Sequence, residues 1–376
     1  MRSQLHLSNK YAIMNKYFIS GTNKITVKNP KMKTSVIDND ITEILSADLP
    51  WDDLSGKTIA ITGANGMLAA YLVDTLLCLE NKPRQVIALV RSPEKANVRF
   101  AAHRGDRNFR IQNWSYEETD LNLPDCNILI HAASIPRPDS ETPVDVIGPN
   151  EIGTWNLLQY VRRLPRFEQF VFFSSGAVYG DRFSNDTPVS EEQFFPVDQM
   201  NPASCYAESK RAGENICVSF MRQYKIPVKI VRYAHTFGPG MDLEHDPRSF
   251  VSFVRAAKDG KNIRLTGTGC ATRYFCYVTD ATIALFTIIL KGRTGEAYNV
   301  SNPQNAITIR ELAETIVSLV PEKDLKVIPN GTSGPKGYAP QQFAPCPSNA
   351  KVSSFGWSPR ISIQEGFQRI LKSLQV

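Results

Sequence analysis

Thr58-Ile-Ala-Ile-Thr-Gly63-Ala-Asn-Gly66-Met-Leu-Ala69 is the stretch of sequence that decides the fold. The apolar run 58–62 predicts a buried strand, and the apolar residues 67–79 predict a helix directly after it. Glycine at 63 permits a tight turn, glycine at 66 lets the backbone approach a pyrophosphate, and alanine at 69 allows close packing of helix on strand. The helix start would offer free N–H groups to that anion. The turn therefore predicts dinucleotide binding by Gly63, Asn65, Gly66, Met67 and Leu68.

Strands and helices alternate along most of the chain that follows. Further strands are expected at 85–90, 109–112, 127–131, 169–174 and 229–233, and helices at 150–162 and 204–224. This alternation predicts an α/β fold with a doubly wound parallel sheet of the Rossmann type. Helical spacing also occurs, between looser segments, at 250–259, 280–290, 309–319 and 361–374. These later elements are expected to form a smaller α/β lobe over the carboxyl edge of the sheet.

The pattern divides the chain into three regions. We expect an N-terminal extension at 1–55, a Rossmann domain at 56–235 and a substrate-binding lobe mainly at 236–376. The extension has one stretch of helical spacing at 37–49, with Asp38 or Asn39 as its expected N-cap. We assign this extension no chemistry.

The composition excludes several classes of protein. The 376 residues are 42% hydrophobic and 21% charged, and a net charge of +6 is dispersed, so we expect a globular protein without a nucleic-acid stripe. No apolar run reaches the roughly 18 residues that span a bilayer, and the first 20 residues lack an uninterrupted apolar region, so we expect a cytoplasmic protein. The seven cysteines include no C-x-x-C pair, which argues against a disulfide framework and a metal site.

The residues after the second expected strand bear on the choice of cofactor. The segment ends Ala88-Leu89-Val90-Arg91-Ser92, without an acidic residue for the ribose hydroxyls of NAD. Arg91 with Ser92 would instead hold the 2′-phosphate of NADP. Arg91 could equally stack on adenine or face solvent, so NAD and NADP both stay open, with a lean to NADP. Asn113, after the third strand, is expected at the adenine amino group.

A tyrosine, a lysine and a serine suggest proton transfer. Tyr206 and Lys210 are four residues apart at the start of an expected helix and therefore share one face. A phenol has a pKa of about 10, and we expect the lysine ammonium to lower the pKa of Tyr206 so that it can act as a base. Ser175 lies at the end of the fifth strand, where doubly wound sheets bind ligands. The preceding residue, Ser174, is the alternative candidate for contact with the substrate hydroxyl. The alternative interpretation is that Tyr206 and Lys210 are a pair of side chains on a helix surface and that Ser175 caps the end of the strand.

The order and spacing of several motifs resemble the extended short-chain dehydrogenase/reductase family, to which the NAD(P)-dependent nucleotide-sugar epimerases and dehydratases belong. The motifs are TGANGMLA (62–69), HAAS (131–134), NEIGTWNLL (150–158), SSGAVYG (174–180), YAESK (206–210), RYAHTFGPG (232–240), RYFCYVTD (273–280) and YNVSN (298–302).

The resemblance implies a catalytic set and two binding sites. By it, Ser175, Tyr206 and Lys210 are catalytic, and a nucleoside diphosphate sugar binds under the smaller lobe. The cofactor would also contact Arg91, Asn113, Ala132, Ala133, Ser134, Lys210 and Tyr233. The substrate would contact Ser175, Tyr206, His235, Arg248 and Arg273, with Arg273 on the diphosphate and Arg248 either assisting or forming a structural ion pair. The family also implies a homodimer, formed through helices near 150–165 and 206–224.

Departures from the family's patterns narrow the reaction. The sugar dehydratases of this family follow the residue equivalent to Ser175 with Asp-Glu, and the decarboxylases that make UDP-xylose keep an acidic residue before Val-Tyr-Gly. Gly176 and Ala177 stand at those places and cannot exchange protons. We therefore predict C4 epimerisation through a transient 4-keto sugar.

Three alternatives stay open. Arg91 favours an NADPH-dependent reductase of a 4-keto-6-deoxy nucleotide sugar. CYAESKR and TFGPGM resemble the UDP-glucuronate decarboxylases. The third is a non-catalytic NAD(P)-binding regulator, a class that usually loses the tyrosine or the lysine. The loops 135–148, 181–200 and 329–347 are expected to select the sugar.

Overall fold

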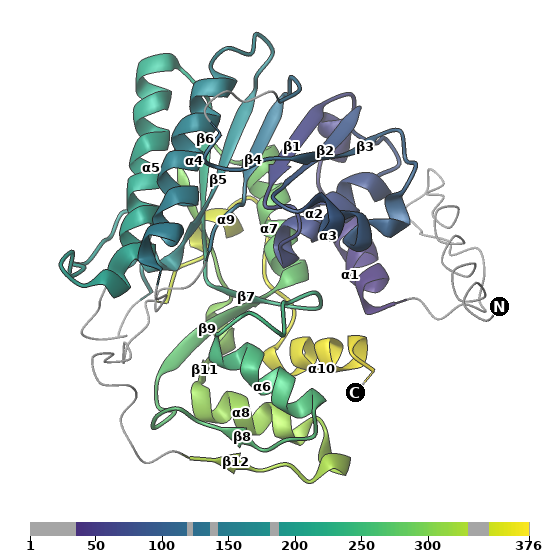
Figure 1. The fold of residues 1–376 in the computed structure, drawn as a ribbon, viewed down its shortest axis with the longest axis vertical. Coiled ribbons are helices and arrows are strands. Elements are labelled where there is room, and N and C mark those ends of the chain that lie inside the picture. Colours follow the sequence, from purple (N-terminus) through teal and green to yellow (C-terminus); the bar gives the residue numbers. More distant parts are fainter. Residues whose placement is uncertain (1–34, 119–122, 136–141, 181–187, 330–345, 376) are drawn as a thin grey trace.

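The computed structural model describes residues 35–118, 123–135, 142–180, 188–329 and 346–375. A large sheet with its helices occupies the upper part of the molecule in Figure 1, and a smaller lobe lies below it. Residues 1–34 of the expected extension, and parts of the three loops expected to select the sugar, lie outside the described residues.

The large sheet has seven strands in the order β10-β6-β5-β4-β1-β2-β3. All neighbouring strands in it are parallel. The strand order reverses between β1 and β4, and ligands bind at such a reversal in doubly wound sheets. The strands are β1 Thr58–Thr62, β2 Gln85–Val90, β3 Phe109–Asn113, β4 Ile128–His131, β5 Gln169–Ser175, β6 Val228–Tyr233 and β10 Ala297–Val300. The predicted Rossmann architecture is confirmed.

Helices cover both faces of this sheet, which explains its continuous apolar strands. In β1, Ile59 and Ile61 pack with α2 and α7 on one face, whereas Ala60 packs with α4 and α5 on the other. The helices around the sheet are α2 Met67–Cys78, α3 Pro93–Arg99, α4 Pro143–Val161, α5 Cys205–Tyr224, α7 Val278–Lys291 and α9 Ala350–Ser353. The predicted helix at 150–162 begins earlier than expected, at Pro143.

The smaller lobe contains a three-stranded sheet of order β11-β9-β7 and a strand pair β12-β8. Its elements are β7 His235–Phe237, α6 Ser249–Lys258, β8 Ile263–Arg264, β9 Thr272–Tyr277, β11 Ala306–Thr308, α8 Ile309–Ser318, β12 Val327–Ile328 and α10 Ile363–Ser373. The chain returns from this lobe to the large sheet, because β10 pairs with β6. The domain boundary near residue 235 remains a prediction.

Short 3-10 helices connect several of these elements. They are η1 Trp51–Leu54, η2 Ala101–His103, η3 Gly176–Tyr179, η4 Pro202–Ser204, η5 Pro303–Asn305 and η6 Pro321–Lys323.

The predicted helix of the N-terminal extension is α1 Val36–Leu45. Its N-cap is Ser35, with Asp38 completing a capping box, so the expected cap at Asp38 or Asn39 was wrong by three or four residues. The two residues lie inside the helix because the hydroxyl of Ser35 already accepts the N–H of Asp38 at 3.1 Å.

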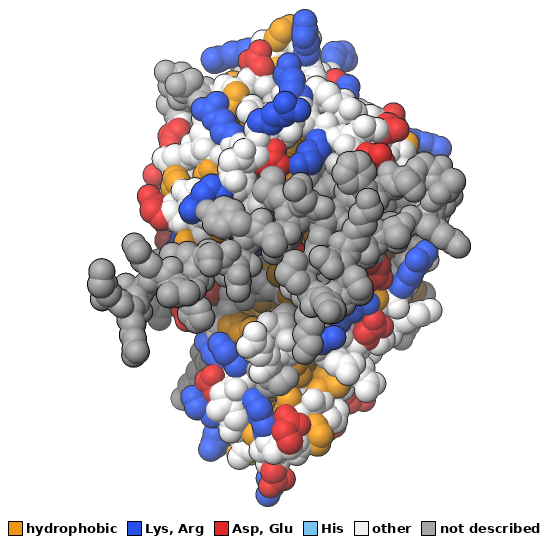
Figure 2. Space-filling view, turned by 90° about the vertical axis from the view of Figure 1, so that its right-hand side faces the viewer, with side chains coloured by type: hydrophobic (Ala, Val, Ile, Leu, Met, Phe, Trp, Pro, Cys, Tyr) orange, Lys and Arg blue, Asp and Glu red, His pale blue; other side chains and the backbone are white. Residues whose placement is uncertain are grey.

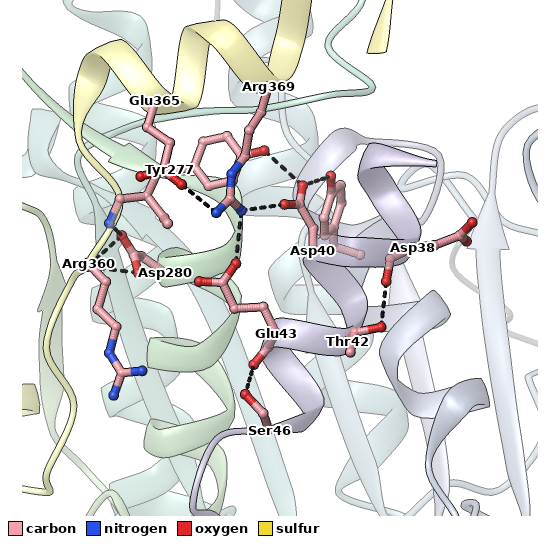
Figure 3. Close-up of polar contacts among 12 residues, drawn as sticks. Asp38, Asp40, Thr42, Glu43, Ser46, Tyr277, Asp280, Arg360, Glu365 and Arg369 are labelled. Carbon is pink, nitrogen blue, oxygen red and sulfur yellow. Dashed lines mark hydrogen bonds and ion pairs between the residues drawn. The ribbon is translucent and has the colours of Figure 1, made fainter. Parts of the chain in front are cut away.

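A buried carboxylate fixes α1 to both parts of the molecule (Figure 3). Asp40 accepts hydrogen bonds from the Tyr71 hydroxyl of α2 and the Tyr277 hydroxyl of β9, each at 2.8 Å. It also pairs at 2.8 Å with Arg369 of α10, which binds Glu43 and Glu365 as well. Burial raises the pKa of Asp40, against the opposing effect of these donors. Since Asp40 is fully buried and has three partners, α1 is an integral part of the fold.

Three further observations concern surface and composition. Basic and acidic side chains are interspersed over the described part of the face in Figure 2. Within the described ranges, no helix combines the length and the apolar character needed to cross a membrane. None of the seven cysteines is joined in a disulfide. The described residues contain no cluster of three His, Cys, Asp or Glu side chains around a possible metal position.

Candidate active site

The glycine turn lies between β1 and α2, and its geometry requires glycine at position 63. Gly63 has φ +63°, and a Cβ there would lie 2.7 Å from Cα of Ala133, which follows β4. Gly66 is the N-cap of α2 and is exposed, and no side chain caps the first N–H groups of that helix. The turn can thus approach an anion with its backbone, as the sequence predicts.

A polar network fixes the HAAS segment beside this turn. Oγ1 of Thr62 accepts the N–H groups of Ala132 and Ala133, each at 3.1 Å, and therefore donates its own proton to Nδ1 of His131 at 2.8 Å. Nε2 of His131 then donates to the carbonyl oxygen of Pro149 at 3.1 Å. Burial lowers the pKa of His131 to about 3, so the ring is neutral. Sequence reasoning missed the roles of Thr62 and His131, although both lie inside quoted motifs.

The expected adenine side of the site keeps both cofactors open. Arg91 is exposed and forms no ion pair with any described residue. The amide group of Asn113 lies against the backbone oxygens of Val90 and Arg91, and it donates to them at 3.1 and 3.3 Å when its nitrogen is assigned to that side. The amide of Asn65 donates to the carbonyl of Ser92 at 3.3 Å.

The serine, tyrosine and lysine of the predicted catalytic set converge at the carboxyl end of β5. Burial raises the pKa of the Tyr206 phenol, and Ser175, at the end of β5, is among the side chains whose hydrogen bonding opposes that shift. The ammonium of Lys210 is buried, donates to the carbonyl oxygen of Phe173 at 2.6 Å and lies 5.9 Å from the centre of the Tyr206 ring. Ser174, the rival of Ser175, points the other way and donates to Glu214 at 2.5 Å. This arrangement favours Ser175 as the partner of Tyr206.

The electrostatics of the phenol differ from the expectation. Burial raises the pKa of Tyr206, and the opposing effects come from Ser175, from the charge of Arg248 and from Ser134. Burial lowers the pKa of Lys210 to about 7, and its ammonium is directed at a carbonyl. The expected lowering of the pKa of Tyr206 was therefore wrong for this structure, because burial outweighs the opposing effects.

The three side chains expected at the substrate lie close to one another. His235 of β7 packs its ring 5.5 Å from Phe275, and its pKa is lowered to about 3 by burial and by the charges of Arg273 and Arg248. Arg248 also forms an ion pair with Asp246 at 2.5 Å, so the predicted ion pair is present together with the contact to the site. His235 is therefore neutral and lies within the electrostatic reach of two guanidinium groups, which suit an anionic ligand.

The buried hydroxyl of Tyr233 is a further candidate for a ligand contact. Tyr233 ends β6, packs its ring 5.0 Å from that of Phe173, and has no hydrogen-bond partner for its hydroxyl among the described residues. An unsatisfied buried hydroxyl is costly, which is consistent with a ligand contact there. The hydroxyl of Ser134 lowers the pKa of Tyr206 without reaching normal hydrogen-bond geometry.

Comparison with known proteins gives the family. The NAD dependent epimerase/dehydratase family matches residues 59–301. UDP-glucuronic acid decarboxylase 3 of Arabidopsis thaliana is 30% identical over 311 residues, which cover 82% of this chain and 86% of that protein. The solved structure of UDP-glucose 4-epimerase of Thermotoga maritima with UDP-glucose has a TM-score of 0.73 at 22% identity. The superposition covers 85% of this chain and 98% of that chain.

A third similar protein is a solved epimerase. UDP-glucuronic acid 4-epimerase of Bacillus cereus, in complex with UDP-glucuronic acid and NAD, has a TM-score of 0.69 at 20% identity, covering 85% and 99% of the two chains. The matched family spans the glycine turn, the strand that ends at Ser175 and the Tyr206–Lys210 pair. The chain belongs to the NAD-dependent epimerase/dehydratase family and is an enzyme of the extended short-chain dehydrogenase/reductase type.

Proposed function

We propose that this enzyme epimerises a nucleoside diphosphate sugar at C4 through a transient 4-keto intermediate. The observation that carries the proposal is the place of Ser175 at the carboxyl end of β5, where the Lys210 ammonium binds the Phe173 carbonyl and lies 5.9 Å from the Tyr206 ring. Gly176 and Ala177 supply no carboxylate for a second proton transfer. Besides the hydride that a nicotinamide would accept from C4 and return to its other face, epimerisation requires that one hydroxyl proton be removed and returned.

The described residues fit NAD or NADP. The first N–H groups of α2 have no side-chain cap and would bind a pyrophosphate, and the unpartnered hydroxyl of Tyr233 offers a polar contact. Ala132 to Ser134 would flank the cofactor, and Lys210 would bind the nicotinamide ribose. The bound nicotinamide would supply reversible hydride transfer. Arg91 leaves the choice between the two cofactors open.

The chain's own residues handle the proton. Ser175 holds the sugar hydroxyl, and Tyr206 takes its proton when the sugar is oxidised and returns it when the sugar is reduced. A raised pKa keeps Tyr206 protonated at rest, so the charge of Arg248 has to favour the phenolate during the reaction. Arg273, with Arg248, would hold the diphosphate.

Decarboxylation of a nucleotide uronate is the second candidate. The 30% identity with UDP-glucuronic acid decarboxylase 3 favours it. The absence of an acid at Gly176 and Ala177 argues against it. The partly buried carboxylate of Glu214 on α5 is held by Arg232 at 2.7 Å and by Ser174, so it does not replace that acid.

Product analysis separates the candidates. The purified enzyme is incubated with UDP-, dTDP-, GDP- and CDP-sugars, including UDP-glucuronate, with and without NADPH, and products are identified by mass spectrometry and NMR. A C4 epimer formed without consumption of added cofactor supports the proposal. Release of carbon dioxide supports decarboxylation, and stoichiometric loss of NADPH supports the ketoreductase.

We also propose a homodimer formed through α4 and α5. Large apolar side chains are exposed on these helices, with Ile152 51%, Trp155 49%, Val218 42% and Tyr224 40% accessible. Such a group on neighbouring helices is typical of an interaction surface. Light scattering coupled to size exclusion should give twice the chain mass of 42.0 kDa, and Trp155→Glu should reduce it to the monomer value.

A further inference from the structure

The end of β5 that carries Ser175 lies beyond the point where this strand is paired on both edges. The register of β5 with β4 ends at Phe172, whereas its register with β6 continues as far as Ser175, which lies opposite Tyr233. Within the described part of the large sheet, Ser174 and Ser175 are thus paired with β6 alone. Such a strand end opens more easily than the strand centre, so further contacts are needed to keep a side chain there in one position.

The alternation of side chains along β5 links the direction of Ser175 to that of its neighbour. Successive side chains of a strand point to opposite faces of the sheet. Phe172 packs with α4 and α5, whereas Phe173 packs with α2 and α7 on the other face. Ser174 continues the first set and Ser175 the second. A contact that holds Ser174 toward α5 therefore also sets the direction in which Ser175 leaves the strand.

Such a contact exists, because Ser174 is held by an ion pair. Its hydroxyl donates to Glu214 on α5 at 2.5 Å, and only 4% of Ser174 is accessible. Glu214 in turn accepts from Nε of Arg232 at 2.9 Å and from a terminal nitrogen of that guanidinium at 2.7 Å. A carboxylate that is bound by two nitrogens of one guanidinium has a fixed orientation. Since Arg232 lies opposite Ser174 on β6, the ion pair joins the end of β5 to β6 and to α5.

Two contacts hold the residues that follow. Nε of Arg211 on α5 donates to the carbonyl oxygen of Val178 at 2.8 Å. The N–H of Ala177 donates to Oγ of Ser175 at 3.2 Å, which leaves the hydroxyl proton of Ser175 available to an oxygen of the substrate. The orientation of the Ser175 hydroxyl thus depends on how the segment 173–178 is held.

We propose that Ser174 is a positioning residue for Ser175: its hydrogen bond to the Glu214–Arg232 pair holds the end of β5 so that Ser175 faces the substrate hydroxyl. The inference rests on the proposed function, in which Ser175 holds that hydroxyl. It adds to that function a serine that touches neither substrate nor cofactor. A displacement of about 1 Å at a reacting group can cost roughly 100-fold in rate, so the direction of Ser175 matters for catalysis.

The effect of Ser174 on this segment can be measured without turnover. Hydrogen–deuterium exchange of the full-length protein, followed by mass spectrometry, reports the opening of the peptide that contains residues 173–180. Exchange in this peptide should be about tenfold faster in Ser174→Ala, as for loss of one hydrogen bond to a charged group.

A matched pair of variants isolates the hydroxyl from the change in volume. Ser174→Val and Ser174→Thr enlarge the same buried side chain by a similar volume, but Ser174→Thr alone keeps a hydroxyl. Exchange in the peptide 173–180 should therefore be about tenfold faster in Ser174→Val than in Ser174→Thr. Thermal melts identify any variant that fails to fold. If Ser174→Ala fails to fold, this pair decides, and if the pair fails to fold, Ser174→Ala decides.

The opposite end of β5 provides a control. Glu168 precedes the strand and forms an ion pair with Lys57 at 2.6 Å. Glu168→Gln removes this carboxylate from the far end of the same strand. Exchange in the peptide 173–180 should be unchanged in this variant.

If turnover is found, a double-mutant cycle separates positioning from general destabilisation. Ser174→Ala should lower kcat roughly tenfold and leave KM within about twofold of the wild-type value. In a protein that already carries Ser175→Ala, the same substitution should change kcat by less than about twofold, because the side chain that Ser174 positions is gone. A residue that only stabilises the fold would lower kcat by the same factor in both proteins.

The inference is overturned by wild-type exchange of the peptide 173–180 in Ser174→Ala, by equal exchange in Ser174→Val and Ser174→Thr, or by the same loss of kcat with and without the Ser175 hydroxyl. If exchange rises as expected but the wild-type enzyme converts no nucleotide sugar, the proposed function fails, and the effect of Ser174 on the segment that carries Ser175 stands.

Discussion

Replacement of Gly63 by alanine tests the geometry on which cofactor binding depends. Alanine at φ +63° adopts the left-handed region, which costs roughly 1 kcal/mol. Its Cβ would also lie 2.7 Å from Cα of Ala133, a backbone atom that cannot rotate away. Relief of such overpacking costs about 1–3 kcal/mol. The free energy of unfolding should therefore fall by about 2–4 kcal/mol in Gly63→Ala.

Gly56 provides a matched control for this substitution. It has φ +69°, and a Cβ there would meet nothing within 4 Å. Gly56→Ala should thus show only the backbone cost of about 1 kcal/mol. Urea denaturation gives both stabilities, and quenching or enhancement of NADH fluorescence gives the dissociation constants. Binding should weaken about tenfold or more in Gly63→Ala, because the turn and residues 132–134 move apart, and should be unchanged in Gly56→Ala. Equal stabilities of the two variants, or unaltered NADH binding in Gly63→Ala, would refute the reasoning.

Three further predictions concern catalysis and stability. Tyr206→Phe should lower kcat by roughly 10²–10⁴-fold, because it removes the hydroxyl that transfers the proton. The dissociation constant of NADH should stay within about twofold of the wild-type value. Full activity in this variant would favour the non-catalytic alternative. Arg369→Met should destabilise the fold by roughly 3 kcal/mol, because Asp40 is left buried without its cation. In urea denaturation, the double variant Arg369→Met/Asp40→Asn should recover part of this loss. If the destabilisations of the two single variants simply add in the double variant, the reasoning is contradicted. Burial raises the pKa of Asp280 to about 6, so protonation of this carboxyl stabilises the folded state at low pH, and that contribution is lost as the pH rises from about 4 to about 6. Asp280→Asn should remove about 2–3 kcal/mol of this pH dependence in unfolding measured between pH 4 and 7, and a wild-type pH dependence in the variant would refute the assignment.

Much of the fold could be predicted because local sequence patterns decide it. The apolar runs at 58–62 and 85–90 match β1 and β2, since a strand buried on both faces needs apolar residues throughout. The pairing of Tyr206 with Lys210 was also predictable, because four-residue spacing places two side chains on one helix face.

Long-range contacts lay beyond such patterns. No local signal in the extension predicted that Asp40 would be fully buried, because its partners Tyr71, Tyr277 and Arg369 come from three distant parts of the chain. The strand β10 was likewise not predicted, although it completes the large sheet beside β6.

The sequence by itself determined the dinucleotide turn, the order of strands and helices, and the residue types available for proton transfer, because each depends on neighbours within a few positions. The tertiary structure alone decided the surroundings of each titratable group: burial raises the pKa of Tyr206 and lowers that of Lys210, whose ammonium is directed at the Phe173 carbonyl. The physical reason is that a pKa depends on burial and on the distance to charges, and both are set by how separate segments pack.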